Sequence, residues 1–170
     1  MDLIKYTMKI LGIEVWYRFS KWDPENKKGK YVDNPKAWEH TQKFMKKILD
    51  KMEVKYIEAE DEAAFYGPKL DLQYKDVYGK EDSLITLQID FALPEKFDLK
   101  YTDKDGKEKL AMVIHRSSTG CTERTISYIL EKTQGNLPLW LSPIQTKVMS
   151  MNEDVKDYAL QINKKLLDTG

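Results

Sequence analysis

Apolar residues recur at helical spacing in four segments of the chain. An apolar residue every three to four positions gives a helix one face that can be buried. The second segment begins at Asn34-Pro35, a helix-capping residue followed by proline at the first helical position, and its apolar face runs from Trp38 to Met52. We therefore predict helices over residues 2–11, 35–52, 122–132 and 153–168.

Other segments alternate apolar and polar residues, or form short apolar runs, and these patterns predict strands. The run from Leu110 to Ile114 is typical of a buried strand. Turns at 78–80 and 103–107 connect neighbouring strands, the second closing a hairpin. The predicted strands cover residues 14–20, 54–57, 69–77, 85–91, 97–102, 110–117 and 144–151. Together the elements predict an α+β fold in which helices flank a largely antiparallel sheet.

The predicted strand at 85–91 has two very different faces. Ile85, Leu87, Ile89 and Phe91 make one face apolar, while the other face carries three side chains that form hydrogen bonds: Thr86, Gln88 and Asp90. Such a polar face is either solvated or a binding surface. The pattern alone favours the solvated face.

Composition indicates a globular protein without an overall charge. Hydrophobic residues make up 41% of the 170 residues, enough for one core, and 28 basic side chains balance 28 acidic ones. The balance gives no global field that would attract nucleic acid or an anionic membrane. The amino terminus is interrupted by charges and lacks the apolar run of a signal peptide or membrane span. A single cysteine excludes an internal disulfide, which suits the cytoplasm, and we expect no membrane partner.

The junction between residues 115 and 124 contains candidate chemistry. Two of the three arginines, Arg116 and Arg124, lie here, and Arg124 falls in the first turn of the predicted helix. Free N–H groups and the helix dipole favour anions at this position, and a guanidinium adds a planar cationic fork for phosphate. A structural pair of Arg124 with Glu123, Glu131 or another carboxylate explains the spacing equally well.

The last part of the chain changes in character. Two prolines bracket an aromatic linker at 136–143, ahead of the predicted strand and the helix that Asn152 caps. One strand and one helix cannot bury both faces of a sheet. We predict a main domain over residues 1–137 and, over 138–170, a piece that docks on it or begins another domain.

Six segments, in order along the chain, resemble threonyl-tRNA synthetase, a class II aminoacyl-tRNA synthetase. They are residues 64–69, 86–91, 93–98, 113–116, 120–124 and 138–143. The resemblance extends over essentially the whole chain. Over residues 1–137 it implies an incomplete class II catalytic domain, with an antiparallel sheet that is flanked by helices and includes the family's motif 3. Over residues 138–170 it implies a truncated α/β appendage, which would be the linker and the first strand and helix of an anticodon-binding-like domain.

The resemblance also implies roles for individual residues. Arg124 corresponds to the motif 3 arginine that holds the terminal phosphates of ATP, and Glu123 adjoins it among the ATP-binding positions. Four residues fall on positions that line the amino acid and adenylate pocket: Tyr66, Lys69, Thr86 and Gln88. His115 corresponds to one of three zinc ligands in the family, where the metal binds threonine. An isolated histidine in an apolar strand is, on the residues alone, more often a packed core residue.

The chain also departs from the family. The positions of motifs 1 and 2 and of two zinc ligands precede the region to which Met1 aligns, so we expect Zn²⁺ not to be held tightly by this chain alone. Asp82-Ser83 replaces an aromatic residue and a glutamine near the nucleotide, and Ile85 replaces a small residue. Cys121 replaces a small serine and is best interpreted as a small, half-buried hydrophobe.

Two classes of function follow from the resemblance. In the first, the chain is a fragment or split subunit of a threonine–tRNA ligase, inactive alone, that binds ATP with Mg²⁺, threonine and tRNA together with a complementary N-terminal fragment. In the second, it is a non-catalytic paralogue that acts as a binding or interaction protein.

Overall fold

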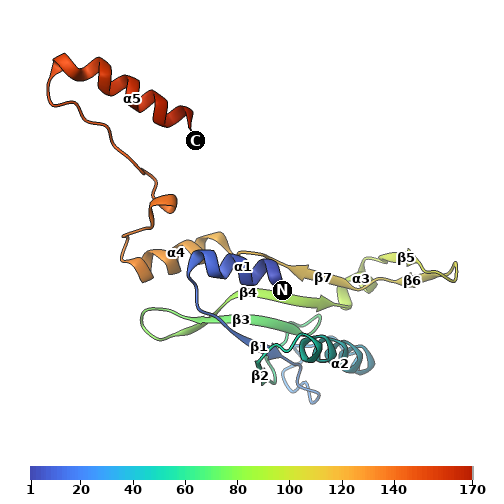
Figure 1. Cartoon of the computed structure of the whole chain (residues 1–170). Helices are drawn as coiled ribbons and strands as arrows, with labels where there is room; N and C mark the ends of the chain where they lie inside the picture. The colour runs from blue at the N-terminus through green and yellow to red at the C-terminus, as the bar shows by residue number, and fades with distance from the viewer. Residues whose placement is uncertain (170) are drawn as a thin grey trace. The chain divides into compact units, whose positions relative to one another are not determined.

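The computed structural model describes residues 1–169, and the chain divides into two compact units, Met1–Lys132 and Thr133–Gly170 (Figure 1). The helices of the first unit are α1 (Asp2–Leu11), α2 (Pro35–Lys51), α3 (Ala92–Lys96) and α4 (Thr122–Thr133), whose last residue belongs to the second unit. Its strands are β1 (Trp16–Ser20), β2 (Tyr56–Ala59), β3 (Lys69–Lys75), β4 (Glu81–Asp90), β5 (Lys100–Thr102), β6 (Glu108–Leu110) and β7 (Val113–Arg116). The second unit contains two short 3₁₀ helices, Leu139–Leu141 and Glu153–Val155, and α5 (Lys156–Asp168).

A five-stranded sheet in the order β2-β1-β3-β4-β7 organises the first unit, and β5 and β6 form a separate two-stranded sheet (Figure 1). Within the larger sheet β1 and β2 are parallel, and the other three neighbouring pairs are antiparallel. The helices and the mainly antiparallel sheet confirm the predicted α+β class.

One face of the sheet is apolar and packs against α2. Apolar residues of β1, β3 and β4 join those of α2, and Val54 from the connection between α2 and β2, in a buried cluster: Phe19, Met45, Leu49, Val54, Leu70 and Ile89. The start of α2 forms as predicted, because the Asn34 side chain accepts a hydrogen bond from the Ala37 N–H at 3.1 Å and Pro35 occupies the first turn. This apolar core leaves the polar residues of the same strands for the opposite face.

The predicted buried strand at 110–117 is wrong in two respects. It divides into β6, which pairs with β5, and β7, which pairs with β4. Both Leu110 (49% exposed) and Ile114 (67% exposed) lie at the surface. The reason is topological, because β7 is the last strand of the sheet in the described residues and β6 belongs to a hairpin of two strands.

The predicted strand at 144–151 is also wrong, since the described part of the second unit, residues 133–169, contains helices and irregular backbone. A strand needs a neighbour for its backbone hydrogen bonds, and these residues offer none. The Asn152 cap is confirmed: its side chain accepts a hydrogen bond from Val155 N–H at 3.3 Å, and a short 3₁₀ turn leads into α5.

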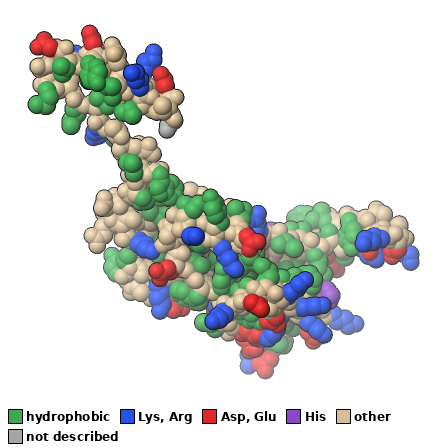
Figure 2. Space-filling model, in the orientation of Figure 1, with side chains coloured by type: hydrophobic (Ala, Val, Ile, Leu, Met, Phe, Trp, Pro, Cys, Tyr) green, Lys and Arg blue, Asp and Glu red, His purple; other side chains and the backbone are tan. Residues whose placement is uncertain are grey.

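The molecular surface reflects the composition. Blue and red side chains are interspersed over the visible face of the first unit in Figure 2, while many exposed side chains of the second unit are apolar, including Leu160, Leu166 and Leu167. Across residues 1–169, none of the helices has both the length and the apolar character required to traverse a bilayer.

Candidate functional site

Strand register collects the polar side chains on one face of the sheet. Residues directly opposite each other in neighbouring strands project to the same face. One row across four strands consists of Ser20, Lys69, Gln88 and His115, and the next consists of Arg18, Asp71 and Thr86. We call these seven residues the polar face. The structure thus brings together four of the predicted site residues: Lys69, Thr86, Gln88 and His115.

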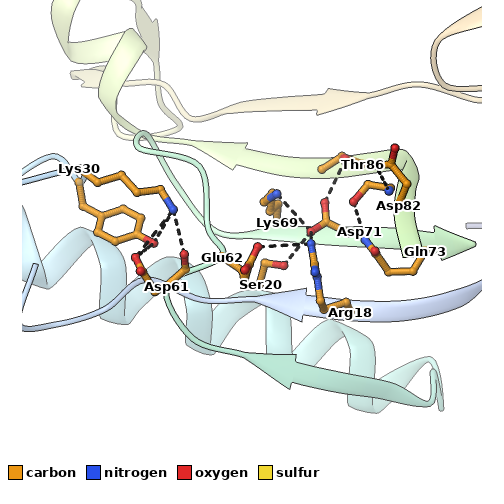
Figure 3. A network of polar contacts seen from close by, with 12 residues as sticks. Arg18, Ser20, Lys30, Asp61, Glu62, Lys69, Asp71, Gln73, Asp82 and Thr86 are labelled. Atoms are coloured by element: carbon orange, nitrogen blue, oxygen red, sulfur yellow. Dashed lines mark hydrogen bonds and ion pairs between the residues drawn. The ribbon is translucent and has the colours of Figure 1, made fainter. Parts of the chain in front are cut away.

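Asp71 lies at the centre of the polar face and is fully buried (Figure 3). Its Oδ2 accepts hydrogen bonds from Ser20 Oγ (2.7 Å) and Arg18 Nη2 (3.1 Å) and lies 3.2 Å from Lys69 Nζ. Its Oδ1 accepts a hydrogen bond from Thr86 Oγ1 at 3.0 Å. One carboxylate therefore orients two of the predicted pocket residues, Lys69 and Thr86.

Two cationic side chains, those of Arg18 and Lys69, contact the single carboxylate of Asp71. Arg18 and Lys69 are partly buried, with side chains 26% and 19% exposed, and Arg18 makes a longer contact of 3.5 Å with Glu62, which is half exposed. Within the buried part of the network two positive charges face one negative charge. Such an excess suits a surface that binds an anionic group.

Tyr66 reaches the polar face from the turn before β3. The turn lies tightly against β4, because a Cβ added to Gly67 would be 1.7 Å from the Ile89 carbonyl oxygen. The Tyr66 hydroxyl donates a hydrogen bond to Gln88 Oε1, so two further predicted pocket residues are in contact. Burial raises the pKa of the Tyr66 phenol and the Asp90 charge raises it further, although the bond to Gln88 lowers it. The phenol therefore remains a donor at neutral pH.

His115 lies beside Tyr66, with ring centroids 5.8 Å apart, and its Nε2 is 2.9 Å from Asp90 Oδ2. Imidazole is a common zinc ligand, and this one is 44% exposed. Among residues 1–169, however, the structure contains no group of three His, Cys, Asp or Glu residues placed to hold a metal ion. The described residues therefore do not form a zinc site around His115 by themselves.

Arg124 occupies the first turn of α4, as predicted. Its Nη1 donates a hydrogen bond to the Ser83 carbonyl oxygen and lies 3.5 Å from Asp82 Oδ1. The arginine thus contacts the two residues at which the sequence departs from the family. Ser83 is part of β4 and also contacts β3, because Ser83 Oγ accepts a hydrogen bond from Gln73 Nε2 at 2.5 Å.

Glu123 points to a different neighbour. Its carboxylate accepts a hydrogen bond from Cys121 Sγ at 2.9 Å, and chiefly this bond lowers the pKa of Glu123. Both residues are exposed, so the expectation that Cys121 is half buried is wrong. The structure does not place Glu123 with the polar face.

Arg18, Ser20 and Asp71 are members of the polar face that were not predicted from the sequence. Asp71 does carry a signal, since it alternates with Leu70 and Leu72 and so falls on the polar side of its strand. Its partners on β1 are more than 50 residues away in the sequence, and their pairing depends on strand order.

Comparisons with known proteins agree with this architecture. Residues 23–133 match the family model for the tRNA synthetase class II core domain (G, H, P, S and T). The chain is 52% identical over its full length to the threonine–tRNA ligase of Clostridium perfringens and 54% identical to that of Clostridium botulinum. It spans 27% of the length of each of these relatives.

Solved structures show the same relationship. The RNA binding domain of threonyl-tRNA synthetase from Cryptosporidium parvum matches 99% of the chain with a TM-score of 0.86 at 31% identity, and 42% of that structure is covered. A putative threonyl-tRNA synthetase from Aeropyrum pernix matches 99% of the chain with a TM-score of 0.65 at 28% identity, and 43% of it is covered. The chain belongs to the tRNA synthetase class II core-domain family (G, H, P, S and T), and the relatives and solved structures to which it is similar are threonyl-tRNA synthetases.

Proposed function

We propose that the chain provides the ATP- and threonine-binding face of a threonine–tRNA ligase and acts as a fragment or split subunit of that enzyme. The reaction is ATP-dependent activation of threonine followed by transfer to tRNA. The observation that carries the proposal is the polar face, where Asp71 orients Lys69 and Thr86 while Tyr66 contacts Gln88. A solvated sheet face does not require a fully buried carboxylate at its centre.

The proposed roles follow the chemistry of the side chains. Tyr66, Thr86 and Gln88 provide hydrogen-bonding groups for threonine and its adenylate, and Lys69 provides a cation for the phosphate. Arg124 holds the terminal phosphates of ATP, which enters with Mg²⁺, and Glu123 contributes from the same helical turn. Activation depends on positioning and on charge stabilisation around the transferring phosphorus, so cations on several elements must converge.

The sheet edge supports a role within a larger assembly. In the described residues β7 pairs with β4 on one side, and its Ile114 is 67% exposed. An open edge with an exposed apolar residue can pair with a further strand. We propose that a complementary N-terminal portion provides the remaining strands and zinc ligands, in agreement with the 27% of the relatives' length that this chain spans.

Residues 138–170 are proposed to be the linker and opening of an anticodon-binding-like domain, which makes tRNA a partner of the complete enzyme. The similarity to the Cryptosporidium parvum structure, which is an RNA binding domain, supports this assignment. The exposed apolar residues of α5 agree with a segment that is completed by further structure. As the family functions in protein synthesis, we place the protein in the cytoplasm.

One observation favours a second candidate, a non-catalytic paralogue that binds or interacts. Arg124 already contacts Asp82 and Ser83, so the ATP phosphates would have to compete with a carboxylate 3.5 Å away. This contact agrees with the structural alternative, in which Arg124 pairs with Glu123, Glu131 or another carboxylate, here Asp82.

Titration calorimetry with ATP and Mg²⁺ separates the two candidates. Under the ligase proposal Arg124→Ala weakens ATP binding by about 1.5–3 kcal/mol, the range for a charge-assisted hydrogen bond, and hardly changes the melting temperature. Arg124→Lys restores binding in part, since it lacks the planar fork. Arg116→Ala, which removes the exposed arginine of β7, is the control and leaves binding unchanged. No binding at millimolar ATP, with a melting temperature several degrees lower for Arg124→Ala, would favour the paralogue.

A further inference from the structure

Asp90 is a fully buried carboxylate at the end of β4, and each of its oxygens has a different partner. Oδ1 accepts hydrogen bonds from the backbone N–H groups of Ala92 (3.1 Å) and Leu93 (2.9 Å), which begin α3. Oδ2 lies 2.9 Å from Nε2 of His115. The two backbone bonds fix the orientation of the carboxylate, so Oδ2 is held toward the imidazole.

A carboxylate only accepts hydrogen bonds, whereas a neutral imidazole donates through one nitrogen and accepts through the other. The hydrogen between Oδ2 and Nε2 must therefore belong to the histidine. That assignment removes the hydrogen from Nδ1 and leaves its lone pair free. Carboxylates that bond one ring nitrogen of a histidine commonly fix the tautomer with which the other nitrogen binds a ligand.

We propose that Asp90 is a positioning residue that holds His115 in the Nε2–H tautomer and so presents Nδ1 as the nitrogen that binds ligands. The tautomer is a property of this chain alone. Its use rests on the proposed function, in which Nδ1 would be the atom that this chain offers to Zn²⁺. Without Asp90 the ring could present either nitrogen, since its neighbours Tyr66 and Gln88 are already bonded to each other.

Asp90→Asn provides a sharp test because it reverses the direction of the hydrogen bond with His115 and keeps the hydrogen bonds from the two backbone N–H groups. The two backbone donors need an acceptor, so the Asn oxygen takes the place of Oδ1 and the amide NH₂ faces the imidazole. An NH₂ group donates, which makes Nε2 the acceptor and moves the ring hydrogen to Nδ1. The substitution therefore predicts a reversed tautomer in a protein that keeps both backbone hydrogen bonds at the start of α3.

Long-range ¹H–¹⁵N correlation spectra of the whole chain at about pH 9, well above the ordinary imidazole pKa of about 6.5, show which ring nitrogen carries the hydrogen. We expect Nε2–H for His115 in the wild type and Nδ1–H in Asp90→Asn. His40, the other histidine, is exposed on α2 and serves as an internal control whose spectrum does not change. Nδ1–H in the wild type, or the same tautomer in both proteins, would overturn the proposal.

A second measurement applies if Asp90→Asn loses its dispersed amide spectrum. In the wild type a hydrogen held between Nε2 and a buried carboxylate exchanges slowly with water, so His115 should show a ring N–H signal that His40 lacks. The absence of that signal would contradict the proposal. Both readouts are independent of ATP, threonine and tRNA, so failure of the proposed function leaves them interpretable, and failure of the tautomer test leaves the proposed function standing.

Discussion

At the residue scale, Asp71 concentrates the electrostatics of the polar face. It is fully buried, forms ion pairs with Arg18 and Lys69, and accepts hydrogen bonds from two hydroxyl groups. Removing one partner of a buried ion pair is costly because the remaining charges lose their compensation. The stability of the domain and the geometry of the proposed site therefore depend on the same carboxylate.

Asp71→Asn should lower the free energy of unfolding by about 3 kcal/mol, the low end of the range for a broken buried pair, because Arg18 and Lys69 retain some access to water. Urea denaturation measures the change. Glu62→Gln is the matched control, since it removes a half-exposed carboxylate from the same arginine and should cost no more than about 1 kcal/mol. Equal effects of the two substitutions would show that Asp71 is not the centre of the network.

Much of the polar face could be predicted from local pattern and resemblance. Alternation placed Thr86 and Gln88 on one side of a strand, and the structure confirms this with Lys69 and His115 beside them. The central position of Asp71 could not be predicted, because it depends on the pairing of β1 with β3. The contact of Arg124 with Asp82 depends in the same way on how α4 packs against β4.

At the scale of elements, the connection from β7 to α4 depends on Gly120. Its φ is +76°, and a Cβ there would lie 2.0 Å from the Leu84 carbonyl oxygen. Gly106 in the β5–β6 turn has a similar φ of +74° but no atom within 4 Å of an added Cβ. Substitution of Gly106 therefore reports backbone strain alone, whereas substitution of Gly120 reports the same strain together with a steric clash.

Gly106→Ala should cost about 1 kcal/mol, the strain of a left-handed backbone. Gly120→Ala should cost at least about 3 kcal/mol, since overpacking against a backbone atom adds to that strain. Urea denaturation of both variants provides the comparison. A similar loss in both would mean that α4 moves away from β4 without penalty.

Glu58 connects β2 with its neighbours, as it pairs with Lys46 of α2 at 2.6 Å and Lys21 beyond β1 at 2.9 Å. The hydrogen bonds from Lys46 and then Lys21 lower the pKa of the Glu58 carboxyl below its ordinary value of 4.5. A lowered carboxyl pKa stabilises the fold above the unfolded-state pKa, and that stability is lost as the pH falls through the folded-state pKa.

Glu58→Gln should therefore destabilise the protein at pH 7 and have a smaller effect well below pH 4.5. Because Glu58 is one-third exposed and water screens the pair, we expect a loss of no more than about 1 kcal/mol. Unfolding free energies from about pH 3 to 7, a range that spans the ordinary carboxyl pKa, measure it. If the difference in unfolding free energy between the two proteins does not change with pH, protonation of Glu58 does not contribute to the pH dependence of stability.

Elements with strong periodicity or a cap could be predicted, as α2 and the Asn152 cap show. The five-residue helix α3 was missed because it is too short for a periodic signal, and its first N–H groups bond to the side chain of Asp90 at the end of a strand. The predicted strand at 144–151 had the right local pattern, but no strand in the described residues pairs with it.

At the scale of the whole molecule, the chain consists of two compact units, and the first contains the complete polar face. Compact units with their own cores commonly fold independently. The buried clusters centred on Phe19 and Trp38 both lie within the first unit.

A chain that ends before Trp140 should unfold cooperatively, with a melting temperature within a few degrees of the full chain. Differential scanning calorimetry of both proteins tests this expectation. Loss of the cooperative transition would mean that residues 140–170 are required to stabilise the first unit. The amide spectra of the two proteins should also overlap for residues of the sheet.

The proposed function makes this chain one part of a threonine–tRNA ligase site that needs the remaining parts to act. Threonine-dependent exchange of pyrophosphate into ATP measures the first step of that reaction. The chain should show no exchange alone and clear exchange after mixing with a complementary portion of the Clostridium perfringens relative, of which this chain spans 27%. Exchange that stays absent although the two chains form a stable complex would contradict the claim and favour a non-catalytic paralogue.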